Sequence, residues 1–194
     1  MQNFVQNNNY GLLIDLDGTI IQKNEFITGE VEKSIKKLNQ YMPIAIVTGR
    51  GPQDVWKFSS YLDLYGPQYC ENGASAVKAQ SKEILEVSLI PDDLSAKIMQ
   101  EFKNSNLEYL VVSDGKTLIN PQNYLSNISS LVLSSKVQND LEKFVKKYNT
   151  LLDSNLIEFS TDENGNYFIN IHNNPLGKAK AYDHRSEERR VGKE

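Results

Sequence analysis

The chain has 194 residues, of which 39% are hydrophobic and 24% are charged, and its formal net charge is −4. This length and balance are typical of a folded protein with a sizeable core and unlike those of a disordered chain. The acidic balance argues against general nucleic-acid binding, which needs a basic face, so an anionic substrate would need locally placed cations.

Cysteine and histidine are scarce, which restricts the possible cross-links and metal sites. Cys70 is the only cysteine, so an intrachain disulfide and a cysteine-only metal cluster are excluded. His172 and His184 are too few for a multi-histidine zinc site. No apolar stretch is long enough to span a membrane, and residues 1–10 lack the pattern of a signal peptide. We therefore expect a cytoplasmic protein with no membrane or nucleic-acid partner.

The first third of the chain alternates short apolar runs with helical patterns. Residues 11–14 form a continuous apolar run, which is typical of a strand buried on both faces, and a helix is expected from about Thr28. Residues 43–47 predict a second strand, Pro52 starts a second helix, and residues 68–70 predict a third strand. This order predicts an α/β fold with a Rossmann-like, doubly wound parallel sheet that binds ligands at the carboxyl ends of its strands.

The middle of the chain has a different pattern, with adjacent hairpins and two helices that begin near Pro91 and Val137. Asn164-Gly165 is a strong turn signal between the last two strands. The expected strands are residues 76–79, 84–90, 108–112, 130–133, 156–159 and 167–171. We therefore expect residues 76–171 to form a separate α+β cap inserted into the first domain.

Two carboxylates follow the first expected strand, in residues 15–19 (Asp-Leu-Asp-Gly-Thr). Asp15, at the strand end, can attack phosphorus to form an aspartyl-phosphate, which divides hydrolysis into two easier steps. Asp17 points the same way two residues later, so it can protonate the leaving oxygen and later deprotonate the attacking water. Gly18 permits a sharp exit from the strand, and its loop is a candidate phosphate ligand together with the Thr19 hydroxyl.

The same carboxylates predict a metal ion. Asp15 and Asp17 would repel a phosphate dianion, so a divalent cation is needed, and Mg²⁺ prefers such oxygen ligands. The alternative is that the motif is only an acidic turn, and the strand before it together with the signals after it argues against that alternative.

Thr48-Gly49-Arg50 follows the second expected strand. A hydroxyl and backbone N–H groups at this position can hold phosphate oxygens, although an ordinary strand-to-helix turn capped by Thr48 is the alternative. The position beside the first strand favours phosphate binding by Thr48 and Gly49. Arg50 can contact the substrate or pair with a carboxylate of the cap.

Two further signals come later in the chain. Asn72-Gly73 ends the third expected strand, where it forms a turn or contacts the substrate. Lys178 lies where the chain returns from the cap, and a cation there would neutralise both the phosphate and Asp15. A solvated lysine is the alternative, and the spacing favours Lys178 over Lys180.

Together, residues 15–19, 48–50 and 71–74 resemble the motifs of the haloacid dehalogenase-like phosphatases, specifically the Cof-like subgroup of subfamily IIB. The resemblance runs from about residue 10 to residue 183. It implies a core of residues 10–75 and 172–183 with residues 76–171 as the cap.

The resemblance also implies roles for the residues named above. Asp15 would be the nucleophile, Asp17 the general acid/base, Thr48 a hydroxyl donor to phosphate and Lys178 the phosphate-binding lysine. The backbone carbonyl of Asp17 would join the Mg²⁺ ligands.

The end of the sequence departs from the family pattern. Members continue past the lysine into a strand that ends in Gly-Asp-x-x-Asn/Asp, which supplies another magnesium carboxylate, and the chain lacks this motif. We interpret residues 184–194, which are dense in charge, as a non-native or disordered stretch, with a genuine charged helical tail as the alternative. The core sheet would then be incomplete and residues 12–14 would form an exposed apolar edge. We expect such a chain to be poorly soluble and nearly inactive.

The predicted function is a Mg²⁺-dependent phosphatase for a small phosphorylated metabolite, of the sugar phosphate or phosphoglycolate type. One alternative is a phosphosugar mutase, in which the aspartyl-phosphate passes to another hydroxyl. The other is a catalytically deficient module that binds a phosphorylated metabolite. Neither the individual substrate nor the oligomeric state follows from the sequence.

Overall fold

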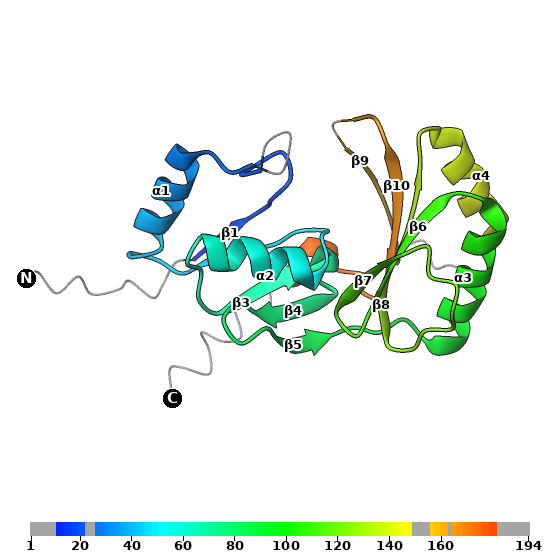
Figure 1. The fold of residues 1–194 in the computed structure, drawn as a ribbon, viewed down its shortest axis with the longest axis horizontal. Coiled ribbons are helices and arrows are strands. Elements are labelled where there is room, and N and C mark those ends of the chain that lie inside the picture. Colours follow the sequence, from blue (N-terminus) through cyan, green and yellow to red (C-terminus); the bar gives the residue numbers. More distant parts are fainter. Residues whose placement is uncertain (1–10, 22–25, 149–155, 163, 182–194) are drawn as a thin grey trace, which may run out of the picture. The chain divides into compact units, whose positions relative to one another are not determined.

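The structure is a computed structural model that describes residues 11–21, 26–148, 156–162 and 164–181. The predicted tail at residues 184–194 lies outside these ranges. The chain forms two compact units, a first unit of Met1–Glu86 with Leu176–Glu194 and a second unit of Val87–Pro175. Figure 1 draws each unit as a ribbon. The second unit begins after Glu86, later than residue 76, where the cap is expected to begin.

A small parallel sheet lies in the first unit. Strand β1 (Leu12–Ile14) pairs in parallel with β2 (Ile44–Ile46), with Leu12 opposite Ile44 and Ile14 opposite Ile46. Strand β2 is fully buried, whereas β1 is only partly buried and Leu12 is 36% exposed. The expectation that residues 11–14 are buried on both faces is therefore wrong. Within the described residues β1 pairs with β2 alone and forms the edge of the sheet.

The third strand joins this sheet less regularly than the β-α-β-α-β order predicts. Strand β3 (Pro67–Cys70) meets the end of β2 at one parallel bridge, Val47 to Tyr69. One step earlier, the Ile46 N–H donates to the side-chain carbonyl of Gln68 (2.8 Å). A side chain takes the place of a backbone acceptor here, so the regular parallel sheet in the described residues has two strands rather than three.

Both expected helices of the first unit are confirmed. Helix α1 (Gly29–Leu38) starts after Thr28, whose hydroxyl accepts from the Val31 N–H (3.4 Å). Helix α2 (Pro52–Tyr61) begins with Pro52, whose missing N–H costs nothing in the first turn. Both helices pack onto one core, whose buried apolar side chains are Leu16, Ile20, Ile21, Ile27, Ile35, Ile44, Ile46, Val55, Phe58, Leu62, Leu64, Cys70 and Val77.

A short antiparallel sheet completes the described part of the first unit. After the 3₁₀ turn η1 (Glu71–Gly73), strand β4 (Ser75–Lys78) runs back along β3, and β5 (Glu83–Val87) follows in the order β3-β4-β5. The chain returns to this unit at the 3₁₀ turn η3 (Gly177–Ala179). There Lys180 Nζ lies 2.5 Å from Glu86 Oε1, so the ion pair joins the point of exit to the point of return.

The second unit is a five-stranded antiparallel sheet in the order β7-β6-β8-β10-β9. Its elements are α3 (Asp92–Ser105), β6 (Glu108–Ser113), β7 (Lys116–Ile119), β8 (Ile128–Ser135), α4 (Gln138–Tyr148), β9 (Ile157–Thr161) and β10 (Tyr167–His172). The mixed α/β character is as expected, but β7 was not among the expected strands. In the part of the chain that the structure describes, no helix is both long and apolar enough to cross a membrane.

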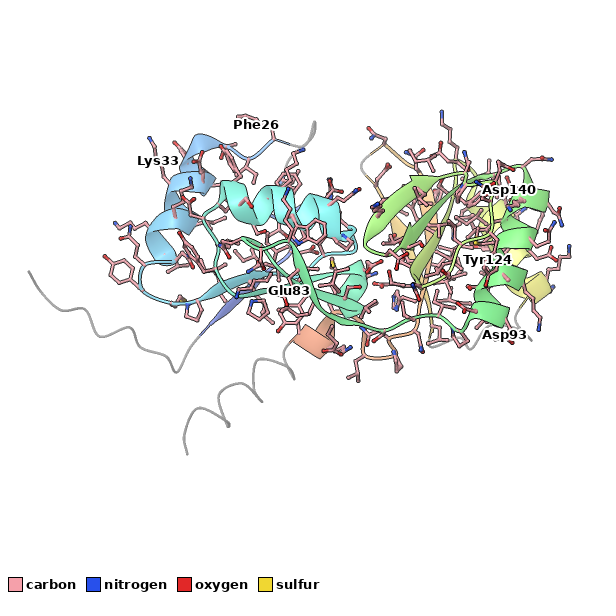
Figure 2. All side chains as sticks on the ribbon, turned by 60° about the horizontal axis from the view of Figure 1, so that its bottom comes forward. Phe26, Lys33, Glu83, Asp93, Tyr124 and Asp140 are labelled. Atoms are coloured by element: carbon pink, nitrogen blue, oxygen red, sulfur yellow. The ribbon has the colours of Figure 1, made fainter. Side chains whose placement is uncertain are left out.

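Alternation along the strands builds the core of the second unit. Side chains at every second position point to the same face of a sheet. Helices α3 and α4 lie along that face in Figure 1 and contact β8. The buried strand residues on it include Tyr109, Val111, Leu131, Leu133, Ile169 and Ile171. Figure 2 shows the charged residues Lys33 of α1 and Asp93 of α3 on the surfaces of their units.

Candidate active site

The carboxylate of Asp15 and the ammonium group of Lys178 form an ion pair. Asp15 directly follows β1, and its Oδ1 accepts from the Leu16 N–H (2.8 Å), which fixes the orientation of the carboxylate. Its Oδ2 lies 2.7 Å from Lys178 Nζ. Both side chains are partly exposed, at 39% for Asp15 and 41% for Lys178. An incoming anion can therefore reach both groups.

Asp17 has a cation of its own. Arg50 donates from Nη2 to Asp17 Oδ1 (2.7 Å), and its Nε lies 3.2 Å from Oδ1 and 3.0 Å from Oδ2. Such fork-shaped, charge-assisted contacts are strong and fix geometry. From the sequence, Arg50 was expected to contact the substrate or a cap carboxylate, and this contact within the first unit was not expected. Each of the two acids therefore faces one basic side chain.

The backbone after Asp17 turns sharply. Gly18 has a φ of +70°, a conformation that L side chains rarely adopt, and no atom lies within 4 Å of where its Cβ would stand. The N–H groups of Thr19, Ile20 and Ile21 all donate to the Leu16 carbonyl, at 3.3, 3.0 and 2.9 Å. Gly18 and Thr19 are exposed beside the two acids. This arrangement leaves open space above the turn.

Thr48 and Gly49 differ in accessibility. Thr48 is fully buried; its N–H donates to the Tyr69 carbonyl (3.1 Å) and its Oγ1 accepts from the Arg50 N–H (3.2 Å). The Thr48 O–H therefore keeps a proton that can be donated to another group. Gly49 is exposed, so its backbone is the accessible part of this loop.

A second loop holds the Thr48–Arg50 loop in place. The Asn72 N–H donates to the Thr48 carbonyl and the Glu71 N–H to the Arg50 carbonyl, both at 2.9 Å. A Cβ on Gly49 would stand 3.0 Å from Asn72 Oδ1, which is tighter than most Cβ contacts, so this close approach favours glycine. Three successive residues of the second loop, Glu71, Asn72 and Gly73, have φ values of +53°, +53° and +84°. Asn72-Gly73 gave a turn signal in the sequence, but no pattern indicated the contact with Gly49.

Cys70 is not a competing nucleophile. It lies at the end of β3, and burial raises the pKa of its thiol well above the ordinary value, with a smaller contribution from the neighbouring Glu71 carboxylate. Reactive cysteines need the opposite shift. Its Sγ lies 3.5 Å from the Ser75 carbonyl as a hydrogen-bond donor.

The carboxylates at this site fit Mg²⁺ better than a softer metal. Within the described residues no group of three His, Cys, Asp or Glu side chains could hold a metal ion by itself. Asp15 and Asp17 can supply hard oxygen atoms, from the Asp15 carboxylate and the Asp17 backbone carbonyl. Mg²⁺ is commonly bound through one or two carboxylates together with water and substrate phosphate, so this pair suits a magnesium ion that arrives with its substrate.

Comparison with known families shows which family the chain belongs to. Residues 12–135 match the haloacid dehalogenase-like hydrolase family. The chain belongs to this family. The match includes Asp15, Asp17 and the loop at Thr48, while Lys178 lies beyond it.

Solved haloacid dehalogenase-like hydrolases share the fold. One from Bacteroides thetaiotaomicron superposes with a TM-score of 0.74 at 14% identity, covering 94% of this chain and 77% of that one. One from Bacillus subtilis gives 0.72 at 15% identity, covering 93% and 79%. A subclass IIB sugar phosphatase gives 0.67 at 14% identity, covering 95% and 76%. At such low identities these matches show the fold alone.

A phosphomannomutase from Spinacia oleracea is 29% identical to this haloacid dehalogenase-like hydrolase over 145 residues. The matched region is 69% of this chain and 56% of the spinach protein, so the chain spans little more than half the length of that relative.

Proposed function

We propose that this haloacid dehalogenase-like hydrolase is a Mg²⁺-dependent phosphatase that acts on a small phosphorylated metabolite through an aspartyl-phosphate. The observation that carries the proposal is the 2.7 Å contact between Lys178 Nζ and Asp15 Oδ2. It places a cation beside a partly exposed carboxylate at the end of a parallel strand, where a phosphate dianion can approach.

Asp15 would attack phosphorus with the oxygen that faces Lys178. Lys178 would then stabilise the negative charge on the phosphate oxygens. Asp17 would give its proton to the leaving oxygen and later take one from the attacking water. The neighbouring Leu16 N–H orients Asp15 through Oδ1, which leaves Oδ2 for the reaction. When bound to Asp15 and the Asp17 carbonyl, Mg²⁺ would neutralise charge between the nucleophile and the phosphate.

The phosphate would be held by the loops that flank the two acids. Exposed backbone at Gly18 and Gly49 and the ammonium of Lys178 are the accessible donors. Thr48 is fully buried in the described structure, and we propose that it contributes its hydroxyl proton to the phosphate from the inner side of the loop. Arg50 was predicted from the sequence as a further phosphate ligand, and in the structure it contacts Asp17.

The substrate class is inferred from the names of similar proteins. A solved neighbour is a subclass IIB sugar phosphatase, which supports a sugar phosphate or a metabolite of similar size, such as a phosphoglycolate. We further propose that β1 to β3 belong to a doubly wound core and that the second unit acts as its cap.

The direct test compares phosphate release from sugar phosphates and phosphoglycolate by the whole chain, with Mg²⁺ and with EDTA. Asp15→Asn should lower turnover by about 1,000-fold or more, since a nucleophile acts as part of a unit. Asp93→Asn, at an exposed carboxylate on α3, is the matched control and should leave turnover unchanged. Equal rates for Asp15→Asn and the parent chain would contradict the proposal.

A covalent-site probe makes the test independent of a slow rate. Beryllofluoride mimics a phosphoryl group on an aspartate, so a Mg²⁺-dependent ¹⁹F signal should appear for the parent chain and vanish in Asp15→Asn. If no adduct and no turnover are seen but phosphorylated ligands bind Asp15→Asn as tightly as the parent, the chain is a binding module.

A mutase is the second candidate, and the similarity to a spinach phosphomannomutase favours it. The chemistry at Asp15 is the same, but the phosphoryl group returns to a different hydroxyl. ³¹P NMR of a sugar phosphate incubated with the chain separates the two, since inorganic phosphate indicates hydrolysis and an isomerised ester indicates transfer.

A further inference from the structure

The side chain of Arg50 contacts two groups besides Asp17, the Phe58 ring and the Asp54 carboxylate. Its guanidinium carbon lies 5.6 Å from the centre of the Phe58 ring, within the range of a cation–π contact. Its Nη1 lies 3.7 Å from Oδ2 of Asp54, which is four residues later, in the first turn of α2. Only 20% of the Arg50 side chain is exposed.

The backbone of Arg50 is fixed on both sides. Its N–H donates to Thr48 Oγ1 (3.2 Å), and its carbonyl accepts from the Glu71 N–H (2.9 Å). Because the backbone that carries it is fixed, the planar guanidinium of Arg50 loses little further conformational freedom when it binds a carboxylate. Arg50 is therefore a rigid partner.

Asp17 is the less restrained member of the pair. Its side chain is 55% exposed, and among the described residues its carboxylate is contacted by Arg50. An exposed aspartate samples several rotamers, and a proton donor must stay within about 3 Å of the oxygen it protonates. The bidentate contact selects one orientation of the carboxylate. An ionised carboxylate accepts these contacts, so Asp17 must take up a proton from water before it can protonate the leaving oxygen.

The two basic residues divide the two acids between them. Lys178 contacts Asp15, and Arg50 contacts Asp17. A phosphate held by Lys178 would lie on the Asp15 side. Arg50 would have to give up its three contacts with Asp17 to reach the same phosphate.

We propose that Arg50 is a positioning residue that holds Asp17, the general acid, toward the leaving oxygen. On this proposal Arg50 is not a ligand of the phosphate. This inference rests on the proposed phosphatase function. It assigns Arg50 a part in proton transfer to the leaving group, whereas the phosphate-binding part belongs to Lys178 and the glycine backbones.

Leaving-group dependence tests the assignment. Glycerol phosphate releases an alkoxide and needs a proton from the acid, whereas p-nitrophenyl phosphate releases a stable anion and needs little help. Arg50→Met should lower kcat for glycerol phosphate by about 100-fold and for p-nitrophenyl phosphate by only a few-fold, with little change in KM. Arg50→Lys should recover part of the loss, because it keeps the charge but not the fork. A rise in KM with equal losses for both esters would make Arg50 a phosphate ligand and overturn the inference.

Lys57→Met is the matched control. Lys57 Nζ also lies over the Phe58 ring, at 5.0 Å from its centre. This variant should keep the parent's ratio of the two kcat values. The same shift in Lys57→Met as in Arg50→Met would show that the packing around Phe58 causes the effect and would overturn the inference.

A stability measurement separates failure of the inference from failure of the proposed function. If the parent chain turns over neither ester and forms no Mg²⁺-dependent beryllofluoride adduct, the phosphatase proposal fails, and the role in proton transfer fails with it. The contact itself is tested by thermal unfolding of Arg50→Met, Asp17→Asn and the double variant. The shift in Tm of the double variant should be smaller than the sum of the single shifts. Additive shifts would overturn the pairing even in an active chain.

Discussion

Lys178 Nζ lies 2.7 Å from Asp15 Oδ2, although 163 positions separate the two residues in the chain. An ion pair this exposed adds little to stability, typically about 0.2–1 kcal/mol, because water and salt screen it. Its contribution to a site for phosphate is larger, since the same ammonium can neutralise charge that develops during the reaction. Function and stability should therefore respond very differently when the lysine is removed.

Lys178→Met should lower the kcat of the phosphatase reaction by about 100-fold, the usual effect of removing one charge-stabilising donor. The free energy of unfolding should change by less than about 1 kcal/mol. Steady-state kinetics and urea unfolding measure the two quantities. Lys33→Met, on the exposed side of α1, is the control and should change neither. A Lys178→Met chain that is fully active would remove Lys178 from the site.

Gly49→Ala should destabilise the chain by about 1–2 kcal/mol, because its Cβ would stand 3.0 Å from Asn72 Oδ1. Asn72→Gly removes that side chain and suits the φ of +53°, so the double variant should regain part of the loss. Urea unfolding measures both effects. Gly29→Ala is the control, since no atom lies within 4 Å of its Cβ position and Gly29 begins α1, and it should be neutral or stabilising. Equal losses in the single and double variants would contradict the crowding between Gly49 and Asn72.

The buried thiol of Cys70 predicts a pH dependence of stability. In the unfolded chain the thiol ionises near pH 8.5, whereas burial raises its pKa in the folded chain well above the ordinary value. The contribution is therefore complete below about pH 8.5 and declines as pH rises, because the unfolded state releases its proton first. Between pH 8 and 9.5 the free energy of unfolding should fall with a slope of up to about 1.4 kcal/mol per pH unit.

Cys70→Ala supplies the control for this slope. The variant should be less stable at neutral pH, because it leaves a small cavity, but its stability should stay flat over the same pH range. Folded parent chain at pH 8 should also react slowly with a thiol reagent that labels the unfolded chain at once. An equal pH slope in the parent and in Cys70→Ala would rule out the thiol as the cause.

Local signals predicted the helices and the two acids. Thr28 and Pro52 gave the starts of α1 and α2, because capping and proline geometry act within one turn. Asp15 and Asp17 were found because strand ends and residue spacing are local properties. The pairing of Arg50 with Asp17 was missed, since it depends on how two loops 33 residues apart meet in space.

Two misses in the sheets have specific causes. Strand β7 was overlooked, although Asp114-Gly115 carries the turn signal of a two-residue hairpin and both residues have positive φ values, of 49° and 72°. The reduced pairing of β3 was not foreseeable, because periodicity cannot show that Gln68 turns its side chain to the Ile46 N–H. A polar residue in an apolar run was the only visible sign.

The ion pair of Glu86 with Lys180 has a consequence for how the chain can be rebuilt. The end of β5 and the residue just after η3 are within 2.5 Å of each other at their charged groups, although 94 positions separate them. A short Gly-Ser link from Glu86 to Leu176 could therefore replace residues 87–175 and leave Lys178 in the first unit, and the loop-closure cost would be small because the ion pair already holds the two ends near each other. The intervening segment could equally be exchanged for that of a related hydrolase. The residues proposed here to carry the reaction would stay the same, and the range of substrates that react with them would change.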